Sequence, residues 1–445
     1  MSDYPQLLSE LPSDWSILFI EEIGEVISGG TPSRSNPRYW GGDIPWVTPG
    51  EVTGLGRKCL EKTNEKITTE GLVRSGAKLL PPNSLLITTR ASLGAAALNA
   101  APATTNQGFK SIAFTKDFSA DYYYHWSTKL KDELVRLASG TTFLEISGSQ
   151  FRKICVPAPP HAEQLKIARI LDTLDTQIQK TEALIAKLEK VKEGLLHDLL
   201  TRGIDENGQL RPSPEQAPEL YKDSPLGLLP KDWSINNVAS IGQVKGGKRL
   251  PYGHDYSSQE TCFRYLRVTD FYGKPYCAGR LEPLDEATFN ILSRYEIQPG
   301  DAFVSIAGSI GYFGIHSPAD AESYRVILTE NAARIVLNSS IHPEYFAFAM
   351  NSETSQKQVE AEKGTGGGVP KLALFRVEQI LFPTPDYGEQ KEIVKRATSL
   401  SSRIANERLR LDKMKAQKQG LMNDLLTGRV RVTPLLDQAQ TPTPA

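Results

Sequence analysis

The amino-acid sequence predicts an α+β fold in which two strand-rich α/β domains are joined by an antiparallel coiled coil of two helices. Three observations predict it: an ordered internal duplication, a long heptad-patterned segment in each half, and a polar, Pro- and Gly-rich segment between the halves. The length agrees with this organisation, because 445 residues are about two to three times the usual size of a domain.

The internal duplication organises the whole chain. Short landmarks of the first half return in the same order in the second half, while the residues between them differ. The repeat is far longer than the roughly 20 to 50 residues of solenoids and propellers, so it predicts two related domains with pseudo-twofold symmetry. The repeated segments are Leu11–Ser16 and Leu229–Ser234, Ser92–Gly94 and Ser309–Gly311, Glu163–Gln164 and Glu389–Gln390, and Gly194–Thr201 and Gly420–Thr427.

Each half has the same internal plan. Its first part alternates short β-rich runs, such as Leu85–Thr89 and Ala302–Ile306, with Gly- and Pro-rich turns. Its second part is a long helix after a Pro-rich segment, where Asp386 and Glu389 have the spacing of a capping box. The predicted boundaries are 1–158 for the first domain, 159–203 for the first helix, 204–229 for a linker, 230–383 for the second domain, 384–430 for the second helix and 431–445 for a flexible tail.

The two long helices carry a coiled-coil pattern, because apolar residues recur in both with alternating spacings of four and three. A solitary amphipathic helix of about 40 residues, some 60 Å long, would leave its apolar stripe in water. The two helices are therefore expected to pair, and an antiparallel pairing would place the domains at opposite ends. The predicted seam and subunit-interface residues are Ile167, Leu171, Leu174, Ile178, Ile185, Leu188, Leu195, Leu199, Ile393, Leu400, Ile404, Leu411, Met414, Leu421 and Leu425.

Composition excludes several classes of protein. The hydrophobic share of 39% and the charged share of 23% are ordinary for a folded globular chain. No apolar run reaches the roughly 18 to 20 residues that span a bilayer, and the first residues lack the pattern of a signal peptide, so a cytoplasmic protein is expected. The four cysteines and six histidines are scattered, which predicts neither a disulfide framework nor a metal site. With a net charge of −1, any DNA-binding face must be a local patch.

Three segments approach enzyme motifs without completing them. Gly242–Lys248 has the spacing of a phosphate loop, but Arg249 stands where Ser or Thr would bind magnesium. Asn36–Trp40 is close to the Asn-Pro-Pro-aromatic signature of adenine methyltransferases, but the second proline and a methyl-donor loop are missing. The acidic residues of Pro385–Lys391 lie within one helical turn, where the helix dipole accounts for them better than nuclease chemistry. No catalytic residue is predicted.

With its ordered internal duplication, the chain resembles the specificity subunit of type I restriction-modification systems over nearly its whole length. The likeness is carried by both Leu-Pro-x-Asp-Trp segments, by Ser28–Pro32 with Ile44–Thr48, by both Glu-Gln pairs and by the two Leu-Leu-Thr helix ends. The second half departs from the first, since Tyr265–Val268 is aligned with Ile-Pro-Trp-Val and Lys245–Lys248 with Ser-Gly-Gly-Thr. Such a departure is expected if each domain reads a different DNA sequence.

The resemblance implies a non-catalytic chain that recognises DNA and assembles partners. The two globular parts would be target recognition domains that read a bipartite, asymmetric target in double-stranded DNA. The helices would hold two methyltransferase subunits, which carry S-adenosylmethionine, and ATP-dependent restriction subunits would complete the complex. ATP and magnesium would belong to those partners, so this chain itself would hold no cofactor and no metal.

Candidate DNA contacts lie in turns or directly after strands, where polar and basic side chains can project toward a groove. The predicted residues are Thr31, Arg34, Arg38 and Arg90 in the first domain, and Lys248, Arg249, Arg267 and Ser309 in the second. Two other functions stay open from the residues alone. One is a fused restriction or modification enzyme with an unrecognised catalytic part, and the other is a coiled-coil scaffold that binds only protein.

Overall fold

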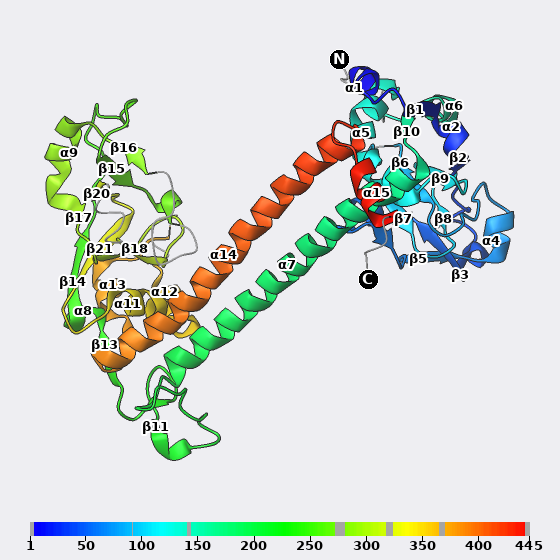
Figure 1. Ribbon diagram of the computed structural model, residues 1–445. Helices are drawn as coiled ribbons and strands as arrows, with labels where there is room; N and C mark the ends of the chain where they lie inside the picture. Colours follow the sequence, from blue (N-terminus) through cyan, green and yellow to red (C-terminus); the bar gives the residue numbers. More distant parts are fainter. Residues whose placement is uncertain are drawn as a thin grey trace, which may run out of the picture. The chain divides into compact units, whose positions relative to one another are not determined.

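The computed structural model describes residues 4–90, 92–139, 144–271, 281–316, 324–364 and 370–440. The chain divides into two compact units, the first made of Met1–Ala183 with Leu409–Ala445 and the second of Leu184–Arg408. The long helices α7 (His161–Thr201) and α14 (Tyr387–Leu426) both contribute residues to both units (Figure 1). Each unit therefore combines the start of one long helix with the end of the other.

The first unit is built around a five-stranded sheet with the order β2-β9-β6-β7-β4, and helix α5 packs on β6 and β7. A three-stranded sheet, β5-β3-β8, and the antiparallel pair β1-β10 complete its strands. The bounds are β1 Ser16–Phe19, β2 Gly24–Ser28, β3 Trp40–Val47, β4 Cys59–Leu60, β5 Glu65–Ile67, β6 Leu85–Thr88, β7 Ala96–Asn99, β8 Thr104–Thr105, β9 Phe109–Phe114 and β10 Cys155–Ala158. The helices are α1 Tyr4–Ser9, α2 Ile20–Ile23, η1 Pro37–Tyr39, α3 Pro49–Thr53, α4 Thr69–Val73, α5 Ala120–Leu137 and α6 Gly148–Arg152, with α15 Thr433–Gln440 after α14.

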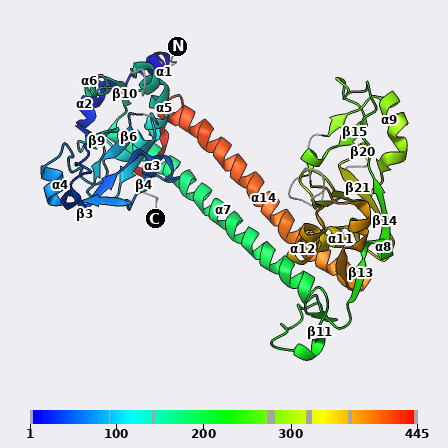
Figure 2. The same cartoon turned by 180° about the vertical axis from the view of Figure 1, so that it is seen from behind.

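The second unit contains two four-stranded sheets, β14-β21-β18-β19 and β16-β15-β20-β17, and the pairs β13-β22 and β11-β12. Helix α11 packs on β18 and β19, and α13 packs on β14. Helix α8 also lies against β14 (Figure 2). The strand bounds are β11 Tyr221–Lys222, β12 Leu229–Pro230, β13 Ser234–Asn237, β14 Gly242–Gly246, β15 Phe263–Leu266, β16 Glu282–Pro283, β17 Glu296–Ile297, β18 Ala302–Ser305, β19 Phe313–Ile315, β20 Arg325–Leu328, β21 Ala332–Leu337 and β22 Leu381–Thr384. The helices are η2 Pro218–Leu220, α8 Val238–Ile241, η3 Val268–Asp270, α9 Glu286–Leu292, η4 Ser293–Tyr295, α11 Pro343–Met350, α12 Glu353–Glu362 and α13 Leu374–Gln379.

Strand pairing shows the duplication in three dimensions. In both units the strand after a short helix, α2 or α8, pairs antiparallel with the last strand of the main sheet, as β2 with β9 and β14 with β21. Both units also contain a corresponding parallel pair, β3 with β8 in the first and β15 with β20 in the second. The predicted α+β fold with an internal repeat is therefore confirmed.

The parallel pairs correct the sequence alignment of the two halves. Trp46 lies opposite Thr104, and Tyr265 lies opposite Ile327, so Tyr265 is the counterpart of Trp46 and not of Ile44. The same hydrogen-bond pattern makes the turn 246–249, rather than 245–248, the counterpart of Ser28–Thr31. The alignment was wrong because short motifs do not set strand register, which long-range hydrogen bonds decide.

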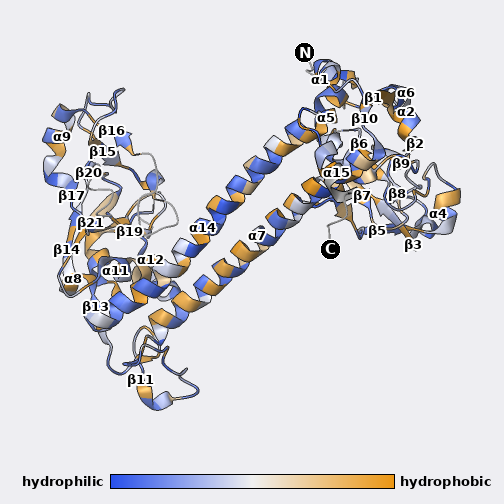
Figure 3. Ribbon diagram, viewed as in Figure 1, coloured by the Kyte–Doolittle hydropathy of each residue, from blue (hydrophilic) through white to orange (hydrophobic). Residues whose placement is uncertain are grey.

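The seam residues of α7 and α14 are buried or half-buried, as the heptad pattern predicts. Those with less than a tenth of their surface exposed are Ile167, Leu171, Leu174, Ile178, Ile185, Leu188, Leu199, Ile393, Ile404, Met414 and Leu425, whereas Leu195, Leu400, Leu411 and Leu421 are half-buried. Both helices alternate apolar and polar residues along their length (Figure 3). Burial of one stripe per helix is the pattern that a packed helix pair requires.

Ion pairs show that the helices run antiparallel. In the first unit Lys418 lies 2.5 Å from Asp175, and Lys415 lies 2.7 Å from Glu182. In the second unit Arg408 pairs with Glu189. Residue numbers rise along one helix as they fall along the other, which confirms the predicted antiparallel pairing.

A cluster in the second unit fastens the end of α7 to the start of α14. Glu389 accepts hydrogen bonds from the indole Nε1 of Trp233 (3.0 Å), from the backbone N of Ile204 (2.6 Å) and from Arg211 (3.1 Å to Oε2). Gly203 has a left-handed φ of 66°, and a Cβ there would lie 2.4 Å from Trp233 Cζ2. Only glycine allows the chain to leave α7 this close to the indole.

The first unit repeats this cluster with the end of α14 and the start of α7. Arg431 pairs with Glu163 and, at 2.8 Å, with Asp14. Gly428 has a φ of 69°, and a Cβ there would lie 3.1 Å from Trp15 Cζ2. We call these two clusters the clasps. The repeated Asp-Trp and Glu-Gln landmarks thus build the fold.

Three segments have contacts that the sequence did not predict. Asp386 accepts from the backbone N of Glu389 at 3.1 Å, but the Glu389 side chain turns to the clasp and does not complete a capping box. The segment 204–229, predicted as a linker, supplies Ile204 and Arg211 to the clasp of the second unit. In the segment predicted as a flexible tail, Val432 is buried and α15 follows. Paired charges and burial connect the described residues of these segments to the rest of their units.

Candidate nucleic-acid interface

Turns at the carboxyl ends of four strands meet around two hollows in the second unit. Strands β14 and β18 both run antiparallel to β21, and β15 runs parallel to β20, so within each sheet the ends of the paired strands point the same way. The following turns line one hollow of about 290 Å³ and another of about 600 Å³. Lys248, Arg249 and Arg267, all predicted as DNA contacts, are among the lining residues.

Arg249 and Glu330 form an ion pair that lines both hollows. Arg249 Nε donates to Glu330 Oε1 at 2.8 Å, and the arginine side chain is 79% exposed. Glu330 Oε2 accepts from Thr329 Oγ1 (2.9 Å) and from the hydroxyl of Tyr265 (3.3 Å). Burial acts to raise the pKa of Glu330, but the hydrogen bonds from Arg249 and Thr329 outweigh it and lower the pKa. The ionised carboxylate holds the guanidinium by one edge.

Arg267 is held more firmly than Arg249. Its Nη2 lies 2.9 Å from Asp270 Oδ1, and its Nη1 lies 2.6 Å from Glu282 Oε1. The hydrogen bond to Asp270 and the charges of both carboxylates raise the pKa of Arg267, which therefore stays charged. Two carboxylates on one guanidinium leave it fewer donors for an outside ligand than Arg249 has.

Lys248 and Ser309 are exposed residues of neighbouring turns. The backbone N of Lys248 donates to Leu328 O at 2.9 Å, and its carbonyl accepts from the Tyr265 hydroxyl at 2.8 Å, so the backbone is anchored while the side chain faces solvent. Ser309 follows β18, and its carbonyl accepts from the Ser305 hydroxyl. Ser309 does not line either hollow.

In the first unit, the Arg34 guanidinium stacks on two tryptophan rings and also pairs with a glutamate. Its guanidinium carbon lies 3.8 Å from the ring centroid of Trp40 and 5.0 Å from that of Trp46. Both of its Nη atoms donate to Glu65, one at 2.8 Å. Trp46 is buried and donates to Gly30 O at 2.9 Å, which connects this group to the turn that carries Thr31.

The other three predicted residues of the first unit differ in their surroundings. The Thr31 hydroxyl donates to Gln107 Oε1. Arg90 lies 3.7 Å from Glu145, with which it also forms an isolated β-bridge. Arg38 is exposed on η1, and its backbone carbonyl accepts from Thr68. The structure thus links Thr31 and Arg34 through the Gly30 turn, and it places Arg38 outside these contacts.

Most of the predicted arginines already hold a carboxylate. The pairs are Arg34 with Glu65, Arg90 with Glu145, Arg249 with Glu330, and Arg267 with Asp270 and Glu282. Such pairing balances the charge of these arginines locally, in a chain with a net charge of −1. It also weakens the general attraction of each arginine for phosphate while leaving some of its N–H donors available for directed hydrogen bonds.

Sequence reasoning missed Gln107 and Glu330. Each lies two residues after a short parallel strand, in the turns that follow β8 and β20. Neither belongs to a repeated sequence motif, and each contacts its partner across more than 70 residues of chain. Only the strand pairing brings these residues to the candidate interface, so no local signal identifies them.

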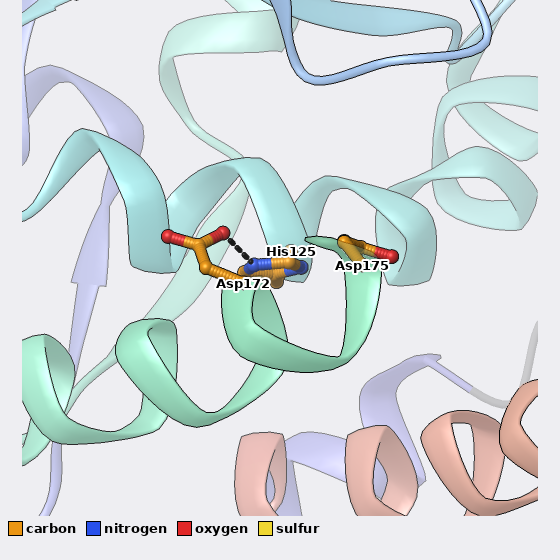
Figure 4. A group of neighbouring side chains, drawn as sticks. All are labelled: His125, Asp172 and Asp175. Carbon is orange, nitrogen blue, oxygen red and sulfur yellow. Dashed lines mark hydrogen bonds and ion pairs between the residues drawn. The ribbon is translucent and has the colours of Figure 1, made fainter. Parts of the chain in front are cut away.

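One cluster in the first unit has the geometry of a metal site. Ligand atoms of His125, Asp172 and Asp175 lie within 4.8 Å of one another (Figure 4). Asp172 accepts from His125 Nε2 at 2.9 Å and from Lys58 Nζ at 2.6 Å, while Asp175 lies 2.5 Å from Lys418. Each carboxylate thus has a lysine as its counter-charge, and the cluster is explained as a tie between α5, α7 and α14.

The described helices include none with an apolar stretch long enough to cross a bilayer. Cys59, Cys155 and Cys262 are free thiols, and Cys277 lies outside the described residues.

The chain matches known proteins over nearly its whole length. Residues 12–190 and 230–416 match the family model described as the type I restriction modification DNA specificity domain. The specificity subunit of the type I restriction enzyme MjaIX from Methanocaldococcus jannaschii is 26% identical over 436 residues, which cover 96% of each chain. The specificity subunit of EcoR124I/EcoR124II from Escherichia coli is 33% identical over 241 residues, 52% of this chain and 53% of that protein.

Solved structures agree with the fold. The crystal structure of a type I restriction-modification S subunit from M. genitalium superposes with a TM-score of 0.56 at 16% identity, over 94% of this chain and 98% of that one. The two family matches fall on the two halves of the internal repeat. The chain therefore belongs to the family of type I restriction-modification specificity subunits, the non-catalytic subunits that recognise the DNA target and assemble with the modification and restriction subunits.

Proposed function

We propose that residues 1–158 read one half of a bipartite double-stranded DNA target and that residues 230–383 read the other half. One observation carries the proposal: the two units share backbone hydrogen bonds around the turns of the interface but differ in the side chains there. Thr31 stands in the first unit where Arg249 stands in the second, and Trp46 stands where Tyr265 stands. A shared scaffold with different side chains suits one docking geometry and two base sequences.

The contacts that we propose have different roles. Thr31, Arg34, Arg90, Arg249 and Arg267 would approach base edges, because their partners fix their directions. Lys248, Arg38 and Ser309 are exposed and would contact phosphates or sugars, which position the protein without reading sequence.

We further propose that α7 and α14 hold two methyltransferase subunits. Leu184 and Val191 of α7 are exposed, seven residues apart and outside the seam, so they form an apolar surface for a partner. A groove of about 700 Å³, lined by residues such as His197, Leu200 and Lys357, lies beside the end of α7 in the second unit. S-adenosylmethionine would be bound by the methyltransferase subunits, and ATP and magnesium by the restriction subunits.

Exchange of one domain tests this division. A chain whose residues 1–158 come from a relative with a known target would be assembled with the methyltransferase subunits, and the methylated sequence would be determined. We expect one half of the methylated motif to change and the other half to stay. A change in both halves, or in neither, would contradict the division. Absence of DNA binding at low salt by the assembled complex would favour a scaffold that binds only protein.

A further inference from the structure

Two matched side-chain pairs lie at equivalent places in the two units. Resting on the proposed division of the target, we propose that the pairs Thr31–Gln107 and Arg249–Glu330 read the corresponding base pair of each half-target. Gln107 would contact adenine in the first half, and Arg249 would contact guanine in the second. Glu330 would be a positioning residue, which acts through Arg249.

Backbone hydrogen bonds establish that the two places are equivalent. In each unit, backbone N–H groups of the Gly-containing turn after β2 or β14 donate to β9 or β21 and to the end of β8 or β20. The turn that follows β8 or β20 donates to the end of β3 or β15. With the first unit named before the second, the bonds are Gly29 N to Phe109 O (3.4 Å) and Gly247 N to Ala332 O (3.0 Å), Gly30 N to Thr105 O (2.8 Å) and Lys248 N to Leu328 O (2.9 Å), and Asn106 N to Val47 O (3.0 Å) and Thr329 N to Leu266 O (3.1 Å). Thr31 is thereby matched with Arg249, and Gln107 with Glu330.

A side-chain contact supports the same match. Trp46 donates its indole N–H to Gly30 O at 2.9 Å, and Tyr265 donates its hydroxyl to Lys248 O at 2.8 Å. Both aromatic residues stand at the same position of the parallel pair. The residue after the anchored carbonyl is therefore presented in the same way in both units, as Thr31 in one and Arg249 in the other.

The second pair has the chemistry of a guanine reader. Arg249 uses Nε for Glu330, and among the described residues neither of its Nη groups has a hydrogen-bond partner. Two N–H donors in one plane match the O6 and N7 acceptors of guanine in the major groove. Glu330 is itself fixed by Thr329 and Tyr265, so it restricts the guanidinium before DNA arrives.

The first pair has the chemistry of an adenine reader. Gln107 is exposed, and its Oε1 accepts from Thr31. The oxygen has a second lone pair, and the amide NH₂ has no hydrogen-bond partner among the described residues. A glutamine amide can accept from N6 and donate to N7 of adenine at once. The Thr31 hydroxyl sets which side of the amide faces outward.

Targeted substitutions test the pairs in the complex reconstituted from this full chain and the methyltransferase subunits. Initial methylation rates would be measured on duplexes in which each specified position of the target is varied in turn. We expect Arg249→Ala to reduce the preference for guanine at one position of the second half-target by about 5- to 150-fold, the equivalent of about 1 to 3 kcal/mol. Gln107→Ala would do the same for adenine in the first half-target.

Further variants separate base reading from folding. Arg249→Lys keeps the charge but cannot make the planar two-donor contact, so it is expected to lose preference at the same position as Arg249→Ala. Glu330→Gln is expected to lose part of that preference, with no added loss in the double variant. Lys248→Ala is the matched control, because a lost phosphate contact lowers rates on all sequences alike. The double exchange Thr31→Arg with Gln107→Glu is expected to turn the first-half preference from adenine to guanine.

The outcomes distinguish this inference from the proposed function. A wild-type complex without any bipartite sequence preference would contradict the proposed function itself. With that preference present, unchanged base preferences in Arg249→Lys and Gln107→Ala would overturn the inference and leave the division standing. A uniform fall in rate over all sequences would overturn it as well, because it would assign the pairs to phosphate contact.

Discussion

The indole of Trp233 donates a hydrogen bond to Glu389 across 3.0 Å, and this bond joins the start of the second domain to the first turn of α14. The same carboxylate pairs with Arg211, which follows α7. One buried glutamate thus connects three segments that are far apart in the sequence. Glu163 occupies the matching place in the first unit, but Trp15 Nε1 has no acceptor among the described residues.

The clasps are expected to contribute unequally to stability. Glu389→Ala would leave the Trp233 N–H without its acceptor and would leave Arg211, only 12% exposed, with the exposed Asp232 as its remaining carboxylate, which should cost about 3 kcal/mol of unfolding free energy. Glu163→Ala should cost less, because Arg431 is 30% exposed and can be hydrated. Urea unfolding followed by tryptophan fluorescence measures both.

A control for the clasps lies one turn further along α14. Among the residues that the structure describes, Glu392 pairs only with Lys395 and Arg396 on the helix surface, so Glu392→Ala should cost about 0.5 kcal/mol or less. Equal losses for Glu389→Ala and Glu392→Ala would show that the clasp does not stabilise the unit.

The helix seam gives a second prediction. Leu174→Asp places a carboxylate in a site that is 9% exposed, so the unfolding free energy should fall by roughly 3 to 5 kcal/mol and assembly with the methyltransferase subunits should fall with it. Leu400→Asp should have a smaller effect, because Leu400 is half-buried. Leu184→Asp, on the exposed side of α7, is the matched control for stability. A wild-type melting temperature for Leu174→Asp would exclude this packing.

A buried histidine predicts how stability depends on pH. Burial lowers the pKa of His316 to about 4 against the opposing effect of Glu296, whereas an unfolded histidine has a pKa near 6.5. The unfolded state therefore binds more protons between these values, and stability is lost as pH falls below about 6.5. At pH 5 the loss from this residue should be about 2 kcal/mol relative to pH 7.

Replacement of the histidine checks its share of the pH dependence. The variant His316→Asn removes the titrating ring, so its unfolding free energy should fall by about 2 kcal/mol less than that of the wild type between pH 7 and pH 5. Urea titrations at both pH values measure this difference. Parallel pH profiles for the two proteins would assign the dependence to other groups.

The carboxylate partners of the interface arginines predict a change in binding to random DNA. Glu65→Gln would free one positive charge at Arg34, since both Arg34 Nη atoms are paired with Glu65. Affinity of the complex for random-sequence duplex should rise at low salt, and the slope of log affinity against log salt should steepen by about 0.9. Fluorescence anisotropy at several salt concentrations measures the slope. An unchanged slope would place the freed charge of Arg34 away from the bound DNA.

Local patterns in the sequence were enough for the large-scale organisation. The repeated Leu-Pro-x-Asp-Trp, Glu-Gln and Leu-Leu-Thr landmarks predicted two related domains, and the 4-3 spacing from Ile167 to Leu199 predicted a buried helix stripe. Both are signals of short range, because helix geometry places residues three and four apart on one face. Eight candidate contact residues could also be assigned to turns or to positions just after strands, since glycines and strand ends mark turns.

The tertiary structure alone decided which side chains form pairs. Arg249 and Glu330 are 81 residues apart, and Arg211 and Glu389 are 178 residues apart, so each pair forms only after strands and helices have packed. The register of β15 against β20 makes Tyr265 the counterpart of Trp46, whereas the sequence motifs aligned Tyr265 with Ile44. Strand register is set by hydrogen bonds between distant segments, and short sequence patterns carry no information about that partner.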